Sequence, residues 1–511
     1  MKLLWTTVSL SYKALQLYRQ TNGVELVLDC ALFVWEVLDW ATRTVTDTER
    51  RELLAPFLDE LKLTEKVCDD MRRSVLPVGE LRNLMSKRLL VSKKSSLKLY
   101  NVGCDIALQL DDPAGAWLWL QRGKARAFAD SLGASSAVPR RLLDRISTDQ
   151  VAYGLLREEQ SILELLREPN VNHVIAARRL ASLRRKMVDH PLLAEAAQLK
   201  DALFSLELEM EELKEALLKT GLTAESVKFV DWYVPVSANV SNQPIILFVR
   251  QLDGTTHSKT ITISAHQIRD WAHEAFQFLD MATPPLRRKT GNRLLKKMNA
   301  LVEGLSDTTL EGDLLILSPS GPLHSVPLHA LDVAGESLIQ RNPVVYVSST
   351  ATLGQCLLRA SIPRNKQEAG GTKYFAVYEE LEKARERDEI FAHIRDMPLH
   401  LPGTVSLGPE VTKSHFLHEC AGATIQRGDI GAGCLWPIDS RAGRAFSEAF
   451  YAEIMQAKAS PHEGVRGALN LASAMRATVS KMRKGELGPE FKQAYYWAPF
   501  TLHGLWYFPT Q

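Results

Sequence analysis

The stretch that decides the fold is LLILSPSG, at residues 314–321. Its first four residues are apolar and indicate a buried strand, and its Pro-Ser-Gly end indicates a turn. A second strand is predicted within VVYVSST at 344–350, where it leads into a helix. Buried strands that alternate with helices are typical of an α/β sheet with parallel strands.

Three more strands are predicted upstream, at Val227–Val236, Ile245–Arg250 and Lys259–Ile263. Asp253-Gly254 separates the second from the third and is a strong signal for a hairpin turn. We expect amphipathic helices over His266–Leu279 and Leu286–Leu305 to connect this meander to the strand at Leu314. These elements and the downstream strands define an α/β domain at 225–508.

The part of the chain before the meander carries almost no strand signal. Apolar residues recur at helical spacing in four segments, at 26–41, 53–63, 97–110 and 114–130. In the last segment small residues alternate with large ones, as in the stacked helical hairpins of tetratricopeptide-type arrays. We therefore expect a helical-repeat array at 1–135, followed by a charged helical hairpin or linker region at 136–222.

The charged region has a basic stretch at Arg178–Lys186 and an acidic stretch at Glu207–Glu215. A basic helix can bind nucleic acid through its phosphates. The alternative is that the basic and acidic helices pack against each other with solvated outer faces. We favour packing, because no aromatic residues are interleaved with the basic ones. Nucleic acid is therefore an unlikely partner.

Several motifs follow the LLILSPSG strand in a fixed order: Pro322–Leu331, Val344–Thr350, Leu435–Asp439, Phe446, Phe450–Tyr451, Ala468, Ala472, Tyr496–Phe500 and Gly504. In this order the set resembles the CHAT domain, a caspase-like and separase-related module usually attached to tetratricopeptide-type helices. The resemblance covers roughly Val227 to Gly504. It implies an α + α/β fold, with an N-terminal helical-repeat array followed by a caspase-like CHAT domain.

The family's activity implies a catalytic Cys and His, in which a thiolate attacks a peptide carbonyl and an imidazole handles the protons. In CHAT domains the His follows a strand like Gly422–Ile425, but Gln426–Asp429 contains no His. The Cys strand and a helix would then have to fit before Cys434, which comes nine residues after Ile425. We therefore expect a truncated central sheet that lacks the dyad segment between 425 and 435.

Other Cys and His residues do not replace the dyad. His418 and Cys420 lie in a predicted helix, where their side chains point about 200° apart. Cys434 is interpreted as a small buried thiol that packs as a hydrophobe. His324 and His329 flank Pro327 in a stretch that matches a non-catalytic part of the family pattern. We therefore assign no catalytic residue.

Asp429 and Asp439 are the acidic residues expected at the carboxyl edge of the sheet, where ligands gather in α/β folds. Asp439 is better interpreted as the N-cap of a helix over Arg441–Met455. The glycines at 428, 431 and 433 do not form a phosphate loop, because no Lys-Ser or Lys-Thr follows. We expect them to form a flexible join.

Composition adds few constraints on function. The 511 residues are 45% hydrophobic and carry a net charge of +2, which favours no acidic partner. The six cysteines show neither C-x-x-C spacing nor the density of a disulfide scaffold, so we expect no metal, no cofactor and a cytoplasmic location. No run of 18 apolar residues predicts a membrane span.

Two hypotheses for function remain open. The first is a catalytically inactive CHAT domain protein, a pseudoprotease that binds protein partners through its helical array and acts as a scaffold. The second is a caspase-like cysteine endopeptidase whose His/Cys segment is lost from this version of the sequence. Whether the chain is an enzyme depends on that segment.

Overall fold

The structure of the chain is a computed structural model, which divides into two compact units, Met1–Glu207 and Leu208–Gln511. It describes residues 6, 10, 12–16, 24–43, 45–74, 98–132, 140–165, 171–204, 210–218, 222–235, 244–281, 292–361, 405–407, 430–435, 439–459, 468–504 and 506–509. Each unit is described by itself. The domain limits expected at 135, 222 and 225 stay predictions.

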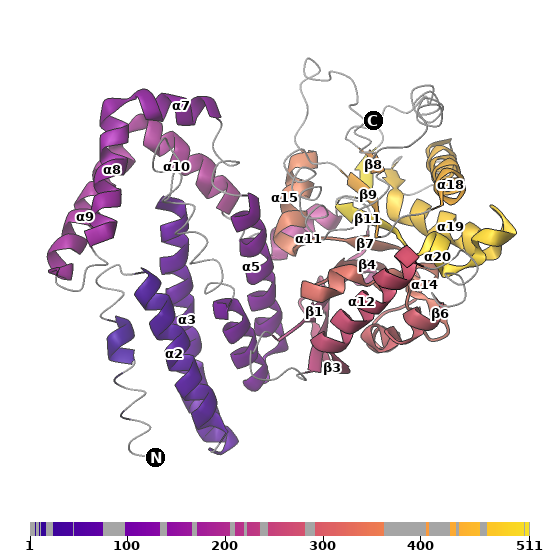
Figure 1. Cartoon of the computed structure of the whole chain (residues 1–511), viewed down its shortest axis with the longest axis horizontal. Coiled ribbons are helices and arrows are strands. Elements are labelled where there is room, and N and C mark those ends of the chain that lie inside the picture. The colour runs from indigo at the N-terminus through magenta and orange to yellow at the C-terminus, as the bar shows by residue number, and fades with distance from the viewer. Residues whose placement is uncertain are drawn as a thin grey trace. The chain divides into compact units, whose positions relative to one another are not determined.

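The described secondary-structure elements of the first unit are all helices (Figure 1). They are α2 (Val24–Thr42), α3 (Asp47–Ser74), a helix at 98–109, α5 (Pro113–Leu132), α7 (Arg140–Thr148), α8 (Gln150–Leu165), α9 (His173–Asp189) and α10 (Pro191–Phe204). Helix α2 packs on α3, α8 packs on α9, and α10 contacts α3, α5, α7 and α9. The predicted N-terminal helical array is confirmed, whereas its tetratricopeptide character stays a prediction.

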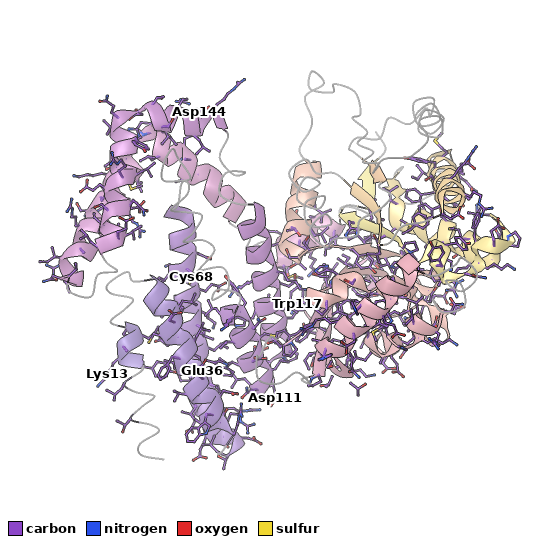
Figure 2. The ribbon with its side chains drawn as sticks, in the orientation of Figure 1. Lys13, Glu36, Cys68, Asp111, Trp117 and Asp144 are labelled. Carbon is purple, nitrogen blue, oxygen red and sulfur yellow. The ribbon has the colours of Figure 1, made fainter. Side chains whose placement is uncertain are left out.

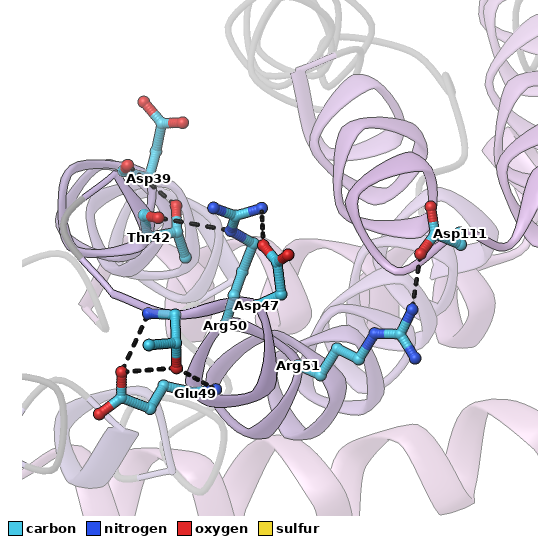
Figure 3. A network of polar contacts seen from close by, with 8 residues as sticks. Asp39, Thr42, Asp47, Glu49, Arg50, Arg51 and Asp111 are labelled. Atoms are coloured by element: carbon cyan, nitrogen blue, oxygen red, sulfur yellow. Dashed lines mark hydrogen bonds and ion pairs between the residues drawn. The ribbon is translucent and has the colours of Figure 1, made fainter.

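The α2–α3 turn is fixed by side chains that cap the helix ends (Figure 3). The Thr46 backbone N–H donates to Oε2 of Glu49 at 3.0 Å, and the Glu49 N–H donates to Oγ1 of Thr46 at 3.4 Å. This reciprocal pair is a capping box, and the backbone bond from Thr46 lowers the pKa of Glu49. Nε of Arg50 donates to the carbonyl of Thr42 at 3.3 Å, which ties α3 to the end of α2.

The second unit is built on an eight-stranded mixed sheet in the order β3-β2-β1-β4-β7-β11-β9-β8 (Figure 1). Its strands are β1 (Val227–Tyr233), β2 (Pro244–Gln251), β3 (Thr256–Ser264), β4 (Leu314–Ser318), β7 (Val344–Tyr346), β8 (Val405–Leu407), β9 (Ile430–Cys434) and β11 (Phe500–Gly504). The β1–β2–β3 meander is antiparallel, and β1, β4, β7 and β11 run parallel. The predicted order of a helical array followed by an α/β domain is therefore confirmed.

The turn predicted at Asp253-Gly254 is present between β2 and β3. Gly254 has φ +95°, a left-handed conformation that favours glycine. Oδ1 of Asp253 accepts a hydrogen bond from the N–H of Thr255 at 2.8 Å, and this bond lowers the pKa of Asp253. The turn predicted from the Asp253-Gly254 pair is thus confirmed by its backbone geometry.

Helices and short elements surround the sheet. They are α11 (Met210–Leu218), η1 (Ala224–Ser226), α12 (Ala265–Met281), η2 (Asn299–Leu301), η3 (Glu303–Ser306), η4 (Gly321–Ser325), η5 (Leu328–Ala330), β5 (Asp332–Val333), β6 (Glu336–Ser337), α14 (Leu338–Arg341), α15 (Thr350–Ser361), α18 (Ser440–Ala459), β10 (Ala468–Asn470), α19 (Leu471–Lys484), η6 (Pro489–Lys492), α20 (Ala494–Trp497) and β12 (Tyr507–Pro509). One core cluster joins Ile268 and Trp271 of α12 to Trp232, Leu317 and Tyr346 of the strands. On α18, Phe446 stacks on Phe500 of β11 with ring centroids 3.7 Å apart.

The single helix predicted over Leu286–Leu305 is wrong in its second half. The described part is helical at 292–296 and then continues as the 3-10 turns η2 and η3. The indole Nε1 of Trp271 donates to the carbonyl of Leu294 at 2.8 Å, and that of Trp232 donates to the carbonyl of Leu301 at 2.9 Å. The two buried indole N–H groups thus donate hydrogen bonds to the carbonyls of Leu294 and Leu301. These two carbonyls therefore have partners without a continuous α-helix.

The flexible join predicted for the glycine run is also wrong in part. Gly431 and Gly433 belong to strand β9, which pairs antiparallel with β11 and parallel with β8. Cys434 is the last residue of that strand. The strand expected at Ala423–Ile425 and the residues Gly428 and Asp429 lie outside the described residues. Pairing with β11 supplies the backbone partners that this glycine-rich segment needs.

Candidate functional site

Three polar aromatic side chains meet in the middle of the sheet. Tyr346 ends β7, and its register partner on the neighbouring parallel strand β11 is His503. His329 comes from η5, a single turn that follows Pro327 between β4 and β5. Tyr346 and His329 are almost fully buried, with 5% and 1% of their surface exposed. We call these residues, His329, Tyr346 and His503, the His–Tyr–His cluster.

The Tyr346 hydroxyl connects to His329 through two contacts. It accepts a hydrogen bond from the His329 backbone N–H at 3.1 Å and lies 2.8 Å from Nδ1 of the same residue. The hydroxyl can accept a second hydrogen bond from Nδ1 or donate its own proton to it, so the two side chains are hydrogen-bonded in either tautomer of His329. The rings are perpendicular, with centroids 5.7 Å apart. Burial raises the pKa of Tyr346, so its hydroxyl stays protonated.

Both imidazoles of the cluster are held neutral. Burial and the neighbouring His503 lower the pKa of His329 to about 3, against a weaker opposing effect of the Ala498 backbone. Burial lowers the pKa of His503 to about 4, although this residue still reaches the surface in part. His503 lies over Tyr346 with ring centroids 5.3 Å apart, and its Nε2 is 3.1 Å from Oγ1 of Thr501. A general base needs a pKa near the working pH, and neither imidazole has one.

Cys434, interpreted from the sequence as a buried thiol that packs as a hydrophobe, is separated from His503 along the paired strands β9 and β11. The register places Cys434 opposite Phe500 and Gly431 opposite His503. Three residues along a strand span roughly 10 Å, so the backbone of Cys434 is well removed from that of His503. The Cys434 side chain is not described, so its burial stays a prediction. A Cys–His dyad needs hydrogen-bond reach, which this spacing does not provide.

The other sequence candidates are placed as follows. Asp439 accepts a hydrogen bond from the backbone N–H of Arg441 at 2.9 Å, which is the capping role predicted for it. The Arg441 guanidinium is the main cause of the lowered pKa of Asp439. His324 is half-buried in η4. His418, Cys420 and Asp429 lie outside the described residues.

The described cysteines of the first unit are not joined by disulfides; they are Cys30, Cys68 and Cys104. Burial raises the pKa of Cys104 well above its ordinary value and also raises that of Cys30. A raised pKa leaves little thiolate, so neither is activated as a nucleophile. Within the described ranges, no three His, Cys, Asp or Glu side chains gather where they could hold a metal ion.

The basic helix α9 finds its ionic partners on α8. Nη2 of Arg179 lies 2.8 Å from Oε1 of Glu158, and Nε of Arg184 lies 2.9 Å from Oε1 of Glu159. These two arginines therefore pair with the preceding helix, and the packing predicted against the acidic stretch at Glu207–Glu215 stays a prediction. Among the described helices, none is both long and apolar enough to cross a membrane.

The C-terminal segment that carries β9, α18, α19 and β11 was compared with known families. Residues 431–505 match the model of the CHAT domain. The resemblance found in the sequence is thus confirmed over this segment. Of the His–Tyr–His cluster, the CHAT segment contains His503, whereas His329 and Tyr346 precede it.

The remaining comparisons concern the whole chain. No curated protein matches it. It is similar to chains in two crystal structures of the Saccharomyces cerevisiae separase–securin complex, with 8% identity and a TM-score of 0.40 in one and 9% and 0.38 in the other. The match covers 98% and 99% of this chain, but 47% and 53% of those chains. The chain therefore spans about half of their length.

Sequence reasoning missed two members of the cluster. Tyr346 was assigned to a strand without a role, and His503 was passed over between Phe500 and Gly504 of the CHAT pattern. A polar aromatic residue inside an otherwise apolar strand is the signal that was available, because such a residue needs a buried partner. The identity of that partner depends on strand order, which local pattern does not provide.

Proposed function

We propose that this chain is a protein-interaction scaffold, in which a CHAT domain without peptidase activity is joined to a helical unit that binds protein partners. The supporting observation is the uneven distribution of exposed apolar side chains. Of the described large apolar residues that are exposed, ten lie within 1–207 and three lie beyond. Interaction surfaces are marked by exposed apolar side chains that share one face, as Phe33 and Trp40 do at a spacing of seven residues on α2.

The chemistry of the second unit supports the inactive alternative over the peptidase. His329 and His503 have pKa values of about 3 and about 4, and both are engaged with Tyr346. They act in this proposal as packing residues that link β7 to β11. Cys30, Cys68 and Cys104 form no disulfide within the described residues, which fits a reducing compartment, so we also propose a cytoplasmic location.

The peptidase arm is tested by hydrolysis of a peptide library with the full chain, beside Cys420→Ala, Cys434→Ala and His503→Ala variants. We expect no hydrolysis above that of heat-denatured chain and no difference among variants. Hydrolysis that disappears in either Cys variant would replace the scaffold with the cysteine endopeptidase.

The binding arm compares apolar surface residues of the two units. The double variant Phe33→Ser/Trp40→Ser removes exposed side chains of α2, and Leu310→Ser removes a still more exposed one from the second unit (74% exposed). We expect proximity labelling to lose specific partners in the α2 variant and to keep them in the Leu310 variant. Equal retention by both variants would contradict binding through the helical unit.

A further inference from the structure

Helix α2 presents an exposed face on which acidic and aromatic residues alternate. Asp29, Phe33, Glu36 and Trp40 follow one another at spacings of four, three and four residues, which places them on one side of the helix. Phe33 is 55% and Trp40 63% exposed, and both carboxylates are exposed as well. Figure 2 shows Glu36 on this helix. We call these four residues the acidic face.

Helix α9 presents a face with the opposite charge. Val174, Arg178, Ala181, Arg185 and Val188 follow at spacings of four, three, four and three residues, so they also share one side. Val174 is 55% and Val188 70% exposed, and the two arginines and Ala181 are exposed too. We call these five residues the basic face.

The charges of the two faces are not used within the chain. Arg179 and Arg184 of α9 are bound to glutamates of α8, whereas Arg178 and Arg185 have no ion pair within the described structure. In the same part of the structure, Asp29 and Glu36 also lack a cationic partner, although the nearby Asp39 is paired with Arg43. The faces therefore do not neutralise each other inside one copy.

We propose that the acidic face of one copy of this chain binds the basic face of a second copy. The two faces match in charge, and both repeat every seven residues, which is the spacing of helices that pack at a shallow crossing angle. The small Ala181 between Arg178 and Arg185 leaves room for Phe33 or Trp40 of the partner copy. An aromatic ring seated there has a guanidinium on either side, an arrangement that favours cation–π contact.

A second copy is the occupant because one chain carries both complementary faces. The contact is heterologous, so two such contacts can close a two-fold dimer, or repeated ones can extend into a longer assembly. A nucleic acid or an anionic membrane would engage the basic face alone and would leave Phe33 and Trp40 exposed. The inference extends the scaffold function without depending on it, since a monomeric chain could still bind other proteins.

The test uses charge reversal and charge exchange in the full chain, followed by sedimentation equilibrium over a concentration series. The variants are Arg178→Glu/Arg185→Glu, Asp29→Lys/Glu36→Lys, and the four-site exchange that combines them. We expect the wild type to self-associate and each double variant to do so at least tenfold more weakly. The four-site variant, and a 1:1 mixture of the two double variants, should both recover association, because opposite charges again face each other.

A matched control reverses charges outside both faces. Glu52 and Arg141 are exposed on α3 and α7, so Glu52→Lys/Arg141→Glu should leave association unchanged. Circular dichroism confirms that each variant stays helical. A wild type that is monomeric up to roughly 100 μM, the range of weak interfaces, overturns the proposal. The proposal is also overturned if both double variants self-associate as strongly as the wild type. It is overturned as well if the chain is monomeric and its basic face binds phosphatidylserine vesicles or an oligonucleotide.

Discussion

Gly103 lies directly against the indole of Trp119. A β-carbon placed on Gly103 would come within 2.3 Å of Cδ2 of that ring. Gly123 makes a similar approach in the reverse direction, where a β-carbon would lie 2.8 Å from Cβ of Tyr100. The helix at 98–109 and α5 therefore touch through glycine on each side. The alternation of small and large residues in the sequence is thus explained by the close approach of these two helices.

Replacement of Gly103 by alanine should destabilise the helical unit by about 1–3 kcal/mol, because the buried Trp119 must shift to admit the methyl group. Gly154→Ala in α8 is the matched control, since a β-carbon there meets nothing within 4 Å. That change should stabilise by about 0.5–1 kcal/mol through helix propensity. Denaturant unfolding followed by circular dichroism measures both, and effects of the same sign would contradict the close approach.

The Arg184–Glu159 pair should matter far more than the Arg179–Glu158 pair. The Glu159 side chain is 3% exposed, whereas that of Glu158 is 40% exposed. Arg184→Leu leaves a buried carboxylate without its partner and should cost about 3 kcal/mol, whereas Arg179→Leu should cost less than about 1 kcal/mol. Urea unfolding measures both, and the double variant Glu159→Leu/Arg184→Leu should recover most of the loss. Equal costs for the two arginines would show that the burial of Glu159 is unimportant.

Stability should depend on pH through the His–Tyr–His cluster. The folded-state pKa values of His329 and His503, about 3 and about 4, lie below the ordinary value of about 6.5. The unfolded chain therefore takes up protons that the folded chain refuses, so stability is complete above about pH 6.5 and falls as the pH decreases toward 4. The upper limit of the loss is roughly 1.4 kcal/mol per pH unit for each histidine.

Urea midpoints at about pH 7, 6 and 5 test this dependence. His329→Gln and His503→Gln should each flatten the slope, and His257→Gln, on the exposed part of β3, should leave it as in the wild type. A wild-type midpoint that is constant from pH 7 to 5 would mean that the histidines are not held neutral by the fold.

Local signals in the sequence were enough for elements whose geometry depends on adjacent residues. The Asp253-Gly254 turn, strand β4 and the helices of the first unit follow from turn chemistry and apolar spacing. The 3-10 turns after residue 296 could not be predicted, because Trp232 lies 69 residues from the carbonyl of Leu301 that it binds. A tertiary hydrogen bond from a distant donor to a backbone carbonyl can outweigh the local preference for an α-helix.

The candidate site escaped prediction for a related reason. His329, Tyr346 and His503 are far apart in the sequence, and Tyr346 meets His503 only because β7 lies next to β11. Strand β9 was missed because Gly431 and Gly433 carry no side-chain pattern. Its existence depends on the partners that β11 provides, and a sequence window around residue 432 does not contain them.

In the described strands, β7 and β11 meet through a single residue pair, Tyr346 with His503, whereas β4 and β7 share three pairs and β11 and β9 share five. Among the described strands the ladder is therefore shortest between β7 and β11, and β11 and most of β9 beyond it belong to the segment that matches the CHAT domain model. Backbone hydrogen bonding contributes little between β7 and β11. The ring contacts of His329, Tyr346 and His503 therefore help to hold the two strands together. Under mechanical load or partial unfolding, the domain should separate first between β7 and β11, where the segment that matches the CHAT domain model meets the rest of the sheet.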